Sequence, residues 1–116
     1  EEELSAYRMV ITPALYAASE ELLTRLRNYA DAGGVLVATF KTGFADEYVK
    51  VYHDLQPHGL TDVFGVHYHE FTFPKQVGLC GALLAVDGCG AQADTFMELL
   101  ETDTAEVLLN YAHAYW

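Results

Sequence analysis

Positively charged residues are scarce in this sequence. Its 116 residues include only six lysines and arginines against 17 aspartates and glutamates, so the formal net charge at pH 7 is −11. A surface of that charge repels nucleic-acid phosphates and anionic lipid headgroups, and we therefore expect neither nucleic acid nor a membrane as a partner. Long apolar runs are also absent, whereas a membrane span needs about 20 such residues. The acidic start is unlike a basic secretory signal, and we expect a cytoplasmic protein.

Cysteine is rare as well, because only Cys80 and Cys89 are present. Two are too few for a disulfide framework, and the eight residues between them fit no zinc motif, so we expect small buried side chains in a reducing compartment. The glycines beside each cysteine suggest a nucleophile elbow, which lifts a thiol above the end of a strand. An elbow must lead into a helix, but the residues after both cysteines have the pattern of strands. A cysteine nucleophile is therefore disfavoured.

Chain length sets a further limit. A (β/α)8 barrel needs at least about 200 residues, so no barrel enzyme fits within these 116. The chain is 52% hydrophobic and 13% aromatic, a composition typical of a packed core and not of a disordered chain. We expect residues 1–116 to form a single domain or a part of one.

The first forty residues have the pattern of a βαβ unit. An apolar run at residues 7–11 predicts a strand that ends before Pro13. Ser19 is suited to cap a helix whose apolar residues recur on one face, and the pair Gly33-Gly34 is suited to end it. The continuous apolar run at residues 35–40 predicts a second strand, parallel to the first and buried on both faces.

The remaining sequence predicts a loop and then a sheet extension. The segment from Lys41 to Pro57 has no periodicity and leaves the carboxyl end of the second strand, where open α/β sheets usually build their sites. A short helical segment that stops at Gly65 follows it. Alternating patterns then predict four strands, in part antiparallel, at residues 66–72, 79–86, 94–100 and 105–112.

Two histidines give a weak metal signal. His67 and His69 lie two residues apart on a predicted strand, so both imidazoles face one side and make half of a metal site. The fold would have to bring His53, His58 or Glu70 to them to complete it. We expect solvated histidines and no metal.

Acidic residues cluster in the loop, where Asp54 follows the adjacent pair Asp46 and Glu47. Glycoside cleavage needs two carboxyl groups roughly 5–10 Å apart, but neighbouring loop residues seldom converge in this way. With 17 acidic residues in the chain, chance clustering is the better explanation. The pair Gly33-Gly34 closes a helix where a dinucleotide fingerprint would open one, and we expect no cofactor.

A family resemblance connects these segments. It is carried by residues 4–16, the helix from Ser19 to Gly34, the Gly-x-x-Asp-Glu pattern within Thr42–Glu47, the helix exit at Leu60–Gly65, and the late strand with Glu106, Val107, Leu108 and Tyr111. Together they resemble the trimerisation domain of glycoside hydrolase family 42 β-galactosidases. The resemblance extends over about residues 4–111 and is most specific in the first 45.

The resemblance implies a flavodoxin-like or class I glutamine amidotransferase-like α/β fold. That fold is a three-layer sheet, here N-terminally truncated because its first βα unit is missing, with antiparallel strands in the C-terminal half. The family packs copies of this domain around a threefold axis and keeps its two catalytic glutamates in a preceding barrel. We therefore interpret the chain as an excised fragment with no catalytic residue of its own. An exposed sheet edge at the truncation would favour self-association.

The function implied is that of an assembly domain of a retaining β-galactosidase, which hydrolyses terminal non-reducing β-D-galactose residues. The parent protein is then an enzyme and this chain alone is not. Within the resemblance, the candidates for the subunit interface or the rim of the sugar pocket are Phe44, Asp46, Glu47 and Tyr48. For Phe44 and Tyr48, an equally good interpretation is that they cap the sheet.

Two alternatives stay open at this point. The first is a stand-alone amidotransferase-like enzyme that uses Cys80 or Cys89 as its nucleophile. The second is a non-catalytic carbohydrate- or ligand-sensing domain of another glycoside hydrolase.

Overall fold

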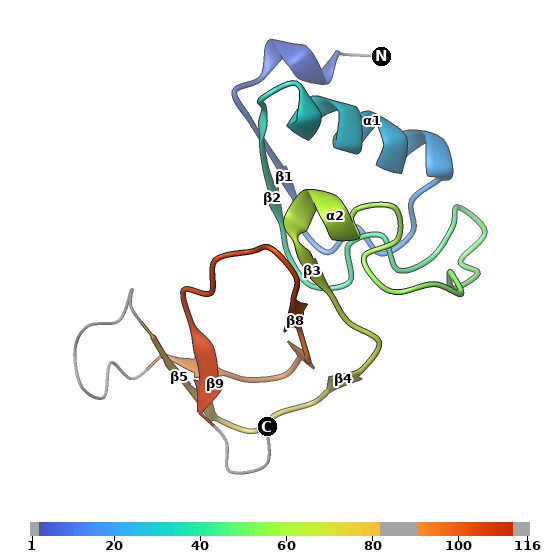
Figure 1. Ribbon diagram of the computed structural model, residues 1–116. Coiled ribbons are helices and arrows are strands. Elements are labelled where there is room, and N and C mark those ends of the chain that lie inside the picture. The colour runs from blue at the N-terminus through green and yellow to red at the C-terminus, as the bar shows by residue number, and fades with distance from the viewer. Residues whose placement is uncertain (1–2, 82–90, 113–116) are drawn as a thin grey trace.

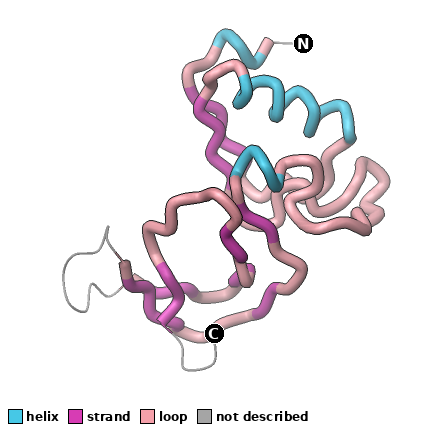
Figure 2. Tube along the Cα trace, viewed as in Figure 1, coloured by secondary structure: helices cyan, strands magenta, loops and turns pink. Residues whose placement is uncertain are grey.

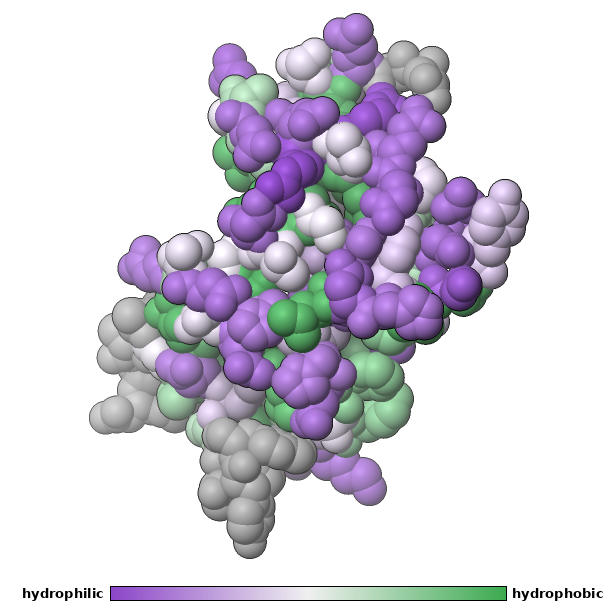
Figure 3. All heavy atoms as spheres, turned by 45° about the vertical axis from the view of Figure 1, so that its right-hand side comes forward, coloured by the Kyte–Doolittle hydropathy of each residue, from purple (hydrophilic) through white to green (hydrophobic). Residues whose placement is uncertain are grey.

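The structure is a computed structural model that describes residues 3–81 and 91–112. Figures 1 and 2 show an N-terminal part, in which a helix lies along a pair of strands, and a C-terminal part made of short strands and long connections. The face drawn in Figure 3 is largely hydrophilic, with hydrophobic patches mainly in its lower half. None of the described helices has the length and hydropathy of a membrane-spanning segment.

The N-terminal part is the predicted βαβ unit. A short 3₁₀ helix, η1 (Leu4–Ala6), precedes strand β1 (Met9–Thr12). Helix α1 (Glu20–Asp31) connects β1 to β2 (Val35–Ala38), and the two strands pair in parallel. The parallel pair predicted from the sequence is confirmed.

Both ends of α1 use the predicted residues. The hydroxyl oxygen of Ser19 accepts a hydrogen bond from the amide of Leu22 at 3.2 Å, which satisfies one of the free donors of the first turn. At the other end Gly33 adopts a φ of 97°, and its N–H donates to the carbonyl of Ala30. The N–H of Gly34 donates to the carbonyl of Tyr29, which completes a Schellman motif.

The core lies between α1 and one face of the β1–β2 pair. Leu23 and Leu26 of α1 are each 2% exposed and pack with Leu60, which is fully buried. The opposite face of the pair is open, since Val35 is 50% exposed and no described element covers it. The prediction that the second strand is buried on both faces is therefore wrong, because helices cover only one side of this pair.

The predicted helical segment is α2 (Thr61–Phe64), and Gly65 ends it in the left-handed conformation. Arg27 of α1 holds α2 in place. Its guanidinium donates to the carbonyl of Gly59 at 2.8 Å and forms a two-pronged salt bridge with Asp62. This contact lowers the pKa of Asp62 and raises the pKa of Arg27.

The C-terminal part consists of short antiparallel strands. β3 (Val66–His67) pairs with β8 (Glu101–Thr102), and β4 (Phe71–Thr72) pairs with β7 (Met97–Glu98). β5 (Val77–Cys80) lies between β6 (Gln92–Ala93) and β9 (Asn110–Ala112).

The predicted flavodoxin-like or amidotransferase-like three-layer sheet is wrong. The described strands form four separate sheets of two or three strands, and only β1 and β2 are parallel. The parallel ladder ends at Thr12 because Pro13 cannot continue it. The predicted strand at residues 66–72 is also broken, because Tyr68 leaves it to exchange backbone hydrogen bonds with Gln56 at 2.9 and 3.0 Å. Much of the predicted strand at residues 79–86 lies outside the described residues.

Gly65, at the end of α2, packs closely against Thr104 and Ala105, and a substitution there tests this contact. Its φ is +69°, and a Cβ built on it would lie 2.7 Å from the amide nitrogen of Ala105. Gly59 has nearly the same φ, +68°, but a Cβ there would meet nothing within 4 Å. We expect Gly59→Ala to lower the free energy of unfolding by about 1 kcal/mol, the cost of the left-handed backbone alone. Gly65→Ala should cost clearly more, as measured by urea unfolding, and equal losses would contradict the described contact.

Candidate functional site

The loop that leaves β2 is folded back on the N-terminal part. The N–H of Ala45 donates to the carbonyl of Tyr16, and the N–H of Ala18 donates to the carbonyl of Ala45, each at 2.9 Å. A further bridge joins Ala45 to Val51 and closes the tip of the loop. The loop therefore has a defined course next to the core.

The four residues predicted to lie at an interface or pocket rim divide into two groups. Phe44 is half-buried, and its ring lies 5.2 Å from the ring of Tyr16. Asp46 shapes the loop tip, since its carboxylate accepts from the amides of residues 48 and 50, both at 2.9 Å. Glu47 and Tyr48 are exposed at this tip, and Tyr48 is 84% exposed. Phe44 thus points into the molecule, whereas the other three residues form the exposed turn at the tip of the loop.

Lys41 stands at the centre of a group of aromatic rings. Its ammonium nitrogen lies 4.6 Å from the ring centroid of Phe44 and 4.2 Å from that of Phe71, with two further rings within 5.3 Å. Cation–π contacts of this kind stabilise both the charge and the arrangement of the rings. We call the aromatic cluster the six residues joined by these and by ring–ring contacts: Tyr16, Phe40, Phe44, Phe71, Phe73 and Phe96.

The cluster joins the two parts of the molecule. Phe40 and Phe44 come from the loop after β2, whereas Phe71 and Phe96 come from strand β4 and the residue before β7. Several of its rings reach the surface: Phe40 is 50% exposed, Phe71 is 37% exposed and Phe73 is 71% exposed. The sequence reasoning found only Phe44 of this group. The alternation of Phe71, Thr72 and Phe73 is the signal that could have revealed two more.

Beneath the cluster, Glu98 is a buried acid. It is 9% exposed, and one of its carboxylate oxygens accepts a hydrogen bond from the backbone N–H of Lys41. Burial raises the pKa of Glu98, and the Lys41 amide, Tyr68 and the Lys41 charge oppose that rise without cancelling it. Sequence reasoning missed Glu98, although a charged residue between Met97 and Leu99 in an apolar strand was a visible signal.

Glu98 also lines a pocket of about 350 Å³ at the carboxyl end of β2. Phe40 and Phe96 form part of its wall, and Tyr68 and Tyr111 add two phenols. Burial, with a smaller contribution from the Glu98 charge, raises the pKa of both phenols. The Glu98 carboxylate acts on Tyr68 electrostatically, but the Tyr68 hydroxyl meets no described partner in hydrogen-bond geometry.

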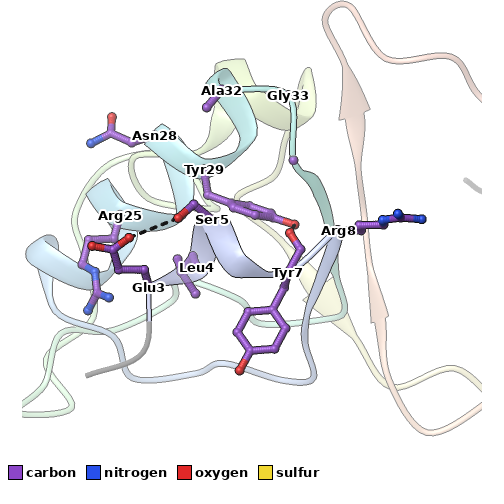
Figure 4. A pocket seen from close by; sticks show the side chains of 11 residues that line it. Glu3, Leu4, Ser5, Tyr7, Arg8, Arg25, Asn28, Tyr29, Ala32 and Gly33 are labelled. Atoms are coloured by element: carbon purple, nitrogen blue, oxygen red, sulfur yellow. Dashed lines mark hydrogen bonds between the residues drawn. The ribbon is translucent and has the colours of Figure 1, made fainter.

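A larger and more open hollow, of about 610 Å³, lies between η1 and the C-terminal end of α1. Figure 4 shows the Tyr29 ring crossing it. The Tyr29 hydroxyl donates to the carbonyl of Tyr7 at 2.9 Å, and Ser5 donates to Glu3 at 3.3 Å. None of the residues nominated from the sequence lines this hollow, and we assign it no function.

The two histidines of the predicted strand lie near carboxylates, although only His67 belongs to β3. His67 Nδ1 lies 2.8 Å from Asp103, and its Nε2 lies 3.7 Å from Glu101, which also approaches His69 at 3.9 Å. Hydrogen bonding to Asp103 raises the pKa of His67. Among the described residues no group of three or more histidine, cysteine or acidic side chains is arranged to hold a metal ion.

The remaining candidates have different surroundings. Cys80 is a free thiol on β5 and is exposed, which differs from the predicted burial, and Cys89 lies outside the described residues. Asp54 bonds to His58, whereas Asp46 is engaged in the loop tip. Asp46 and Asp54 thus bond to different partners in the loop.

A family model described as "Beta-galactosidase trimerisation domain" matches residues 1–116. The chain belongs to this family. Among curated proteins, "Beta-galactosidase BbgII" of Bifidobacterium bifidum is 32% identical over 114 residues, a match that covers 96% of this chain and 16% of that protein. The chain thus spans about a sixth of the length of such relatives, 16% in this case. Membership favours the assembly domain over the amidotransferase-like enzyme.

Solved structures agree with the fold described here. The β-galactosidase from Bacillus circulans sp. alkalophilus is 27% identical with a TM-score of 0.81, and the match covers 99% of this chain and 18% of that one. A GH42 β-galactosidase from G. stearothermophilus gives a TM-score of 0.83 at 24% identity, over 97% of this chain and 16% of that one, which shows the fold alone. The trimerisation domain therefore has the small, mostly antiparallel sheets described above, in place of the three-layer sheet expected.

Glu98 gives this site a testable pH dependence. Because its pKa is raised above the ordinary 4.5, the folded chain holds the proton more tightly than the unfolded chain does, and stability falls as pH rises from about 4.5 through the folded pKa. Glu98→Gln removes this effect and keeps an oxygen for the Lys41 amide. The measurement is urea unfolding at a series of pH values. We expect the unfolding free energy of Glu98→Gln minus that of wild type to increase from about pH 4.5 to the folded pKa of Glu98.

Two further variants make the Glu98 test specific. Glu98→Leu also removes the titration but leaves the Lys41 N–H unpaired, so it should be about 1–3 kcal/mol less stable than Glu98→Gln at every pH. Glu106→Gln removes an exposed carboxylate from the same part of the chain and serves as the control for loss of charge. If Glu98→Gln and Glu106→Gln behaved alike across the pH series, the buried setting of Glu98 would be wrong.

Proposed function

We propose that this chain is the assembly module of a β-galactosidase and that copies of it contact one another through the aromatic cluster and the loop tip at residues 46–48. The observation that carries the proposal is the exposed aromatic surface, together with membership of the trimerisation-domain family. Exposed rings that gather in one place are typical of protein interfaces, where aromatic side chains are enriched.

Charge supports the aromatic cluster as the centre of this contact, and the acidic side chains of Asp46 and Glu47 lie outside the cluster, at the loop tip. Copies with a formal net charge of −11 repel each other, so association is favoured where acidic side chains are few. The cluster consists of aromatic residues around the ammonium group of Lys41, and the acid beneath it, Glu98, is buried. The cluster therefore gives neighbouring copies an apolar contact surface with a local positive charge.

The catalytic step belongs elsewhere in this proposal. The relatives named as β-galactosidases are about six times longer than the matched part, since the chain spans 16% of the first of them. We infer that the parent enzyme hydrolyses terminal non-reducing β-D-galactose residues with groups outside this chain. A nitrophenyl galactoside assay of the chain alone should give no hydrolysis, and turnover by the pure chain would overturn this assignment.

Association itself can be measured by light scattering and analytical ultracentrifugation. We expect the chain to self-associate, and more strongly in 0.5 M than in 0.05 M salt, because salt screens the repulsion between acidic copies. Phe73→Ser should weaken association, whereas Val35→Thr, on the open face of the β1–β2 pair, should leave it unchanged. If only Val35→Thr dissociated the assembly, the contact would lie on that face instead.

The loop tip distinguishes two roles in the full-length enzyme. If Tyr48 lies in the contact between copies, Tyr48→Ala should shift the enzyme toward monomers. If Tyr48 lies at the rim of a neighbouring sugar pocket, the assembly should persist and KM for the galactoside should rise. An unchanged assembly with unchanged kinetics would remove Tyr48 from both roles.

A further inference from the structure

His58 occupies an unusual position at the end of the loop after β2. Its Nδ1 lies 2.7 and 2.8 Å from the two carboxylate oxygens of Asp54, and its Nε2 lies 2.6 Å from Oε1 of Glu20. The imidazole stacks on the ring of Tyr52, with centroids 3.7 Å apart and planes inclined by 12°. Its side chain is only 17% exposed.

These contacts require a charged ring. An ionised carboxylate only accepts hydrogen bonds, so both ring nitrogens of His58 must donate. A neutral imidazole carries one N–H and can serve one carboxylate, whereas the imidazolium carries two and serves both. Loss of one proton therefore leaves a lone pair of the ring facing a carboxylate.

The two carboxylates belong to different elements. Glu20 is the first residue of α1, whereas Asp54 lies in the loop four residues before His58. A second hydrogen bond connects the loop to the residues just before α1, since the hydroxyl of Tyr52 donates to the carbonyl of Ala18 at 2.7 Å. The histidine thus joins the returning arm of the loop, residues 52–58, to the start of the helix.

We propose that His58 is a proton-operated fastener, which holds the loop arm of residues 52–58 against the start of α1 when its ring is charged and loosens the arm when the ring is neutral. The arm also supports the loop tip, because the N–H of Tyr52 donates to the carbonyl of Phe44 at 3.1 Å. Loosening the arm therefore reduces the order of the tip.

The charged groups around the ring all favour the fastened state. Glu20 faces it from α1 and Asp54 from the loop, while Asp46 and Glu47 act on the stacked Tyr52. Burial lowers the pKa of His58, but its bonds to Asp54 and Glu20 outweigh that effect and raise it above the ordinary 6.5. The contribution to stability is thus complete below pH 6.5 and is lost as pH rises through the folded pKa.

The experiment combines ring titration with amide exchange on the whole chain. ¹⁵N NMR of the His58 ring should show both nitrogens protonated at pH 6 and the loss of one proton at higher pH. Hydrogen-exchange protection of amides in residues 52–58, corrected for the intrinsic pH effect, should fall roughly tenfold over the same titration, the size expected for one charge-assisted hydrogen bond. Unchanged protection, or a ring that is neutral at pH 6, would overturn the proposal.

Matched variants separate the fastener from general effects of charge. Glu20→Gln should lower the His58 pKa and weaken protection of the arm at pH 6, whereas Glu21→Gln makes the same charge change one residue away and should have little effect. His58→Gln should abolish the pH dependence. His53→Gln replaces an exposed histidine of the same loop and should retain it. Equal effects of the two glutamate variants would also overturn the proposal.

A consequence for assembly rests on the proposed function, whereas the fastener itself does not. If the loop tip forms part of the contact between copies, wild-type association should weaken over the pH range in which the arm loses protection, and His58→Gln should show no such change. A chain whose arm titrates as described but whose association does not follow would refute the proposed contact and leave the fastener intact.

Discussion

The hydrogen bond from the Lys41 amide to the buried carboxylate of Glu98 is the contact on which the arrangement of this domain depends. Lys41 has a φ of 55°, in the left-handed region, at the point where the chain turns away from β2. Glu98 belongs to β7, so the bond joins the end of the parallel pair to the antiparallel part. With the backbone fixed there, the Lys41 side chain contacts rings from both parts of the molecule. A buried acid is costly, and the amide and the nearby ammonium offset that cost.

Three basic side chains connect separate segments of this acidic chain. Arg27 joins α1 to α2, the Lys41 ammonium contacts rings of the aromatic cluster, and His58 connects the loop to α1. Each of these side chains contacts groups far away in the sequence. In a chain with 17 acidic residues, repulsion between segments is weakest where a cation lies between them, and these contacts mark the places where separate segments meet. The aromatic cluster is an example, because its rings come from separate segments and surround the ammonium group of Lys41.

Family membership and physical structure contribute different parts of the functional argument. The match over residues 1–116 establishes what kind of domain this is, whereas the exposed rings and the loop tip are the basis for the proposed contact between copies. Only one of the four nominated residues, Phe44, belongs to the aromatic cluster. Asp46 has a local task in shaping the turn, which leaves Glu47 and Tyr48 as its outward-facing groups. In the proposal the exposed rings supply the surface for contact, whereas Asp46 and Glu98 accept backbone hydrogen bonds within the domain.

Local chemistry allowed the sequence alone to determine the βαβ unit. A serine that caps a helix, glycines that end one and a proline that stops a strand each act within a few residues, and all three functioned as their types dictate. The sheet arrangement beyond them was decided by tertiary structure. Tyr68 leaves its expected strand to pair with Gln56, and Glu98 meets an amide 57 positions earlier in the chain. Such contacts form only after long loops close, and periodicity within a segment carries no information about which distant segment it will meet.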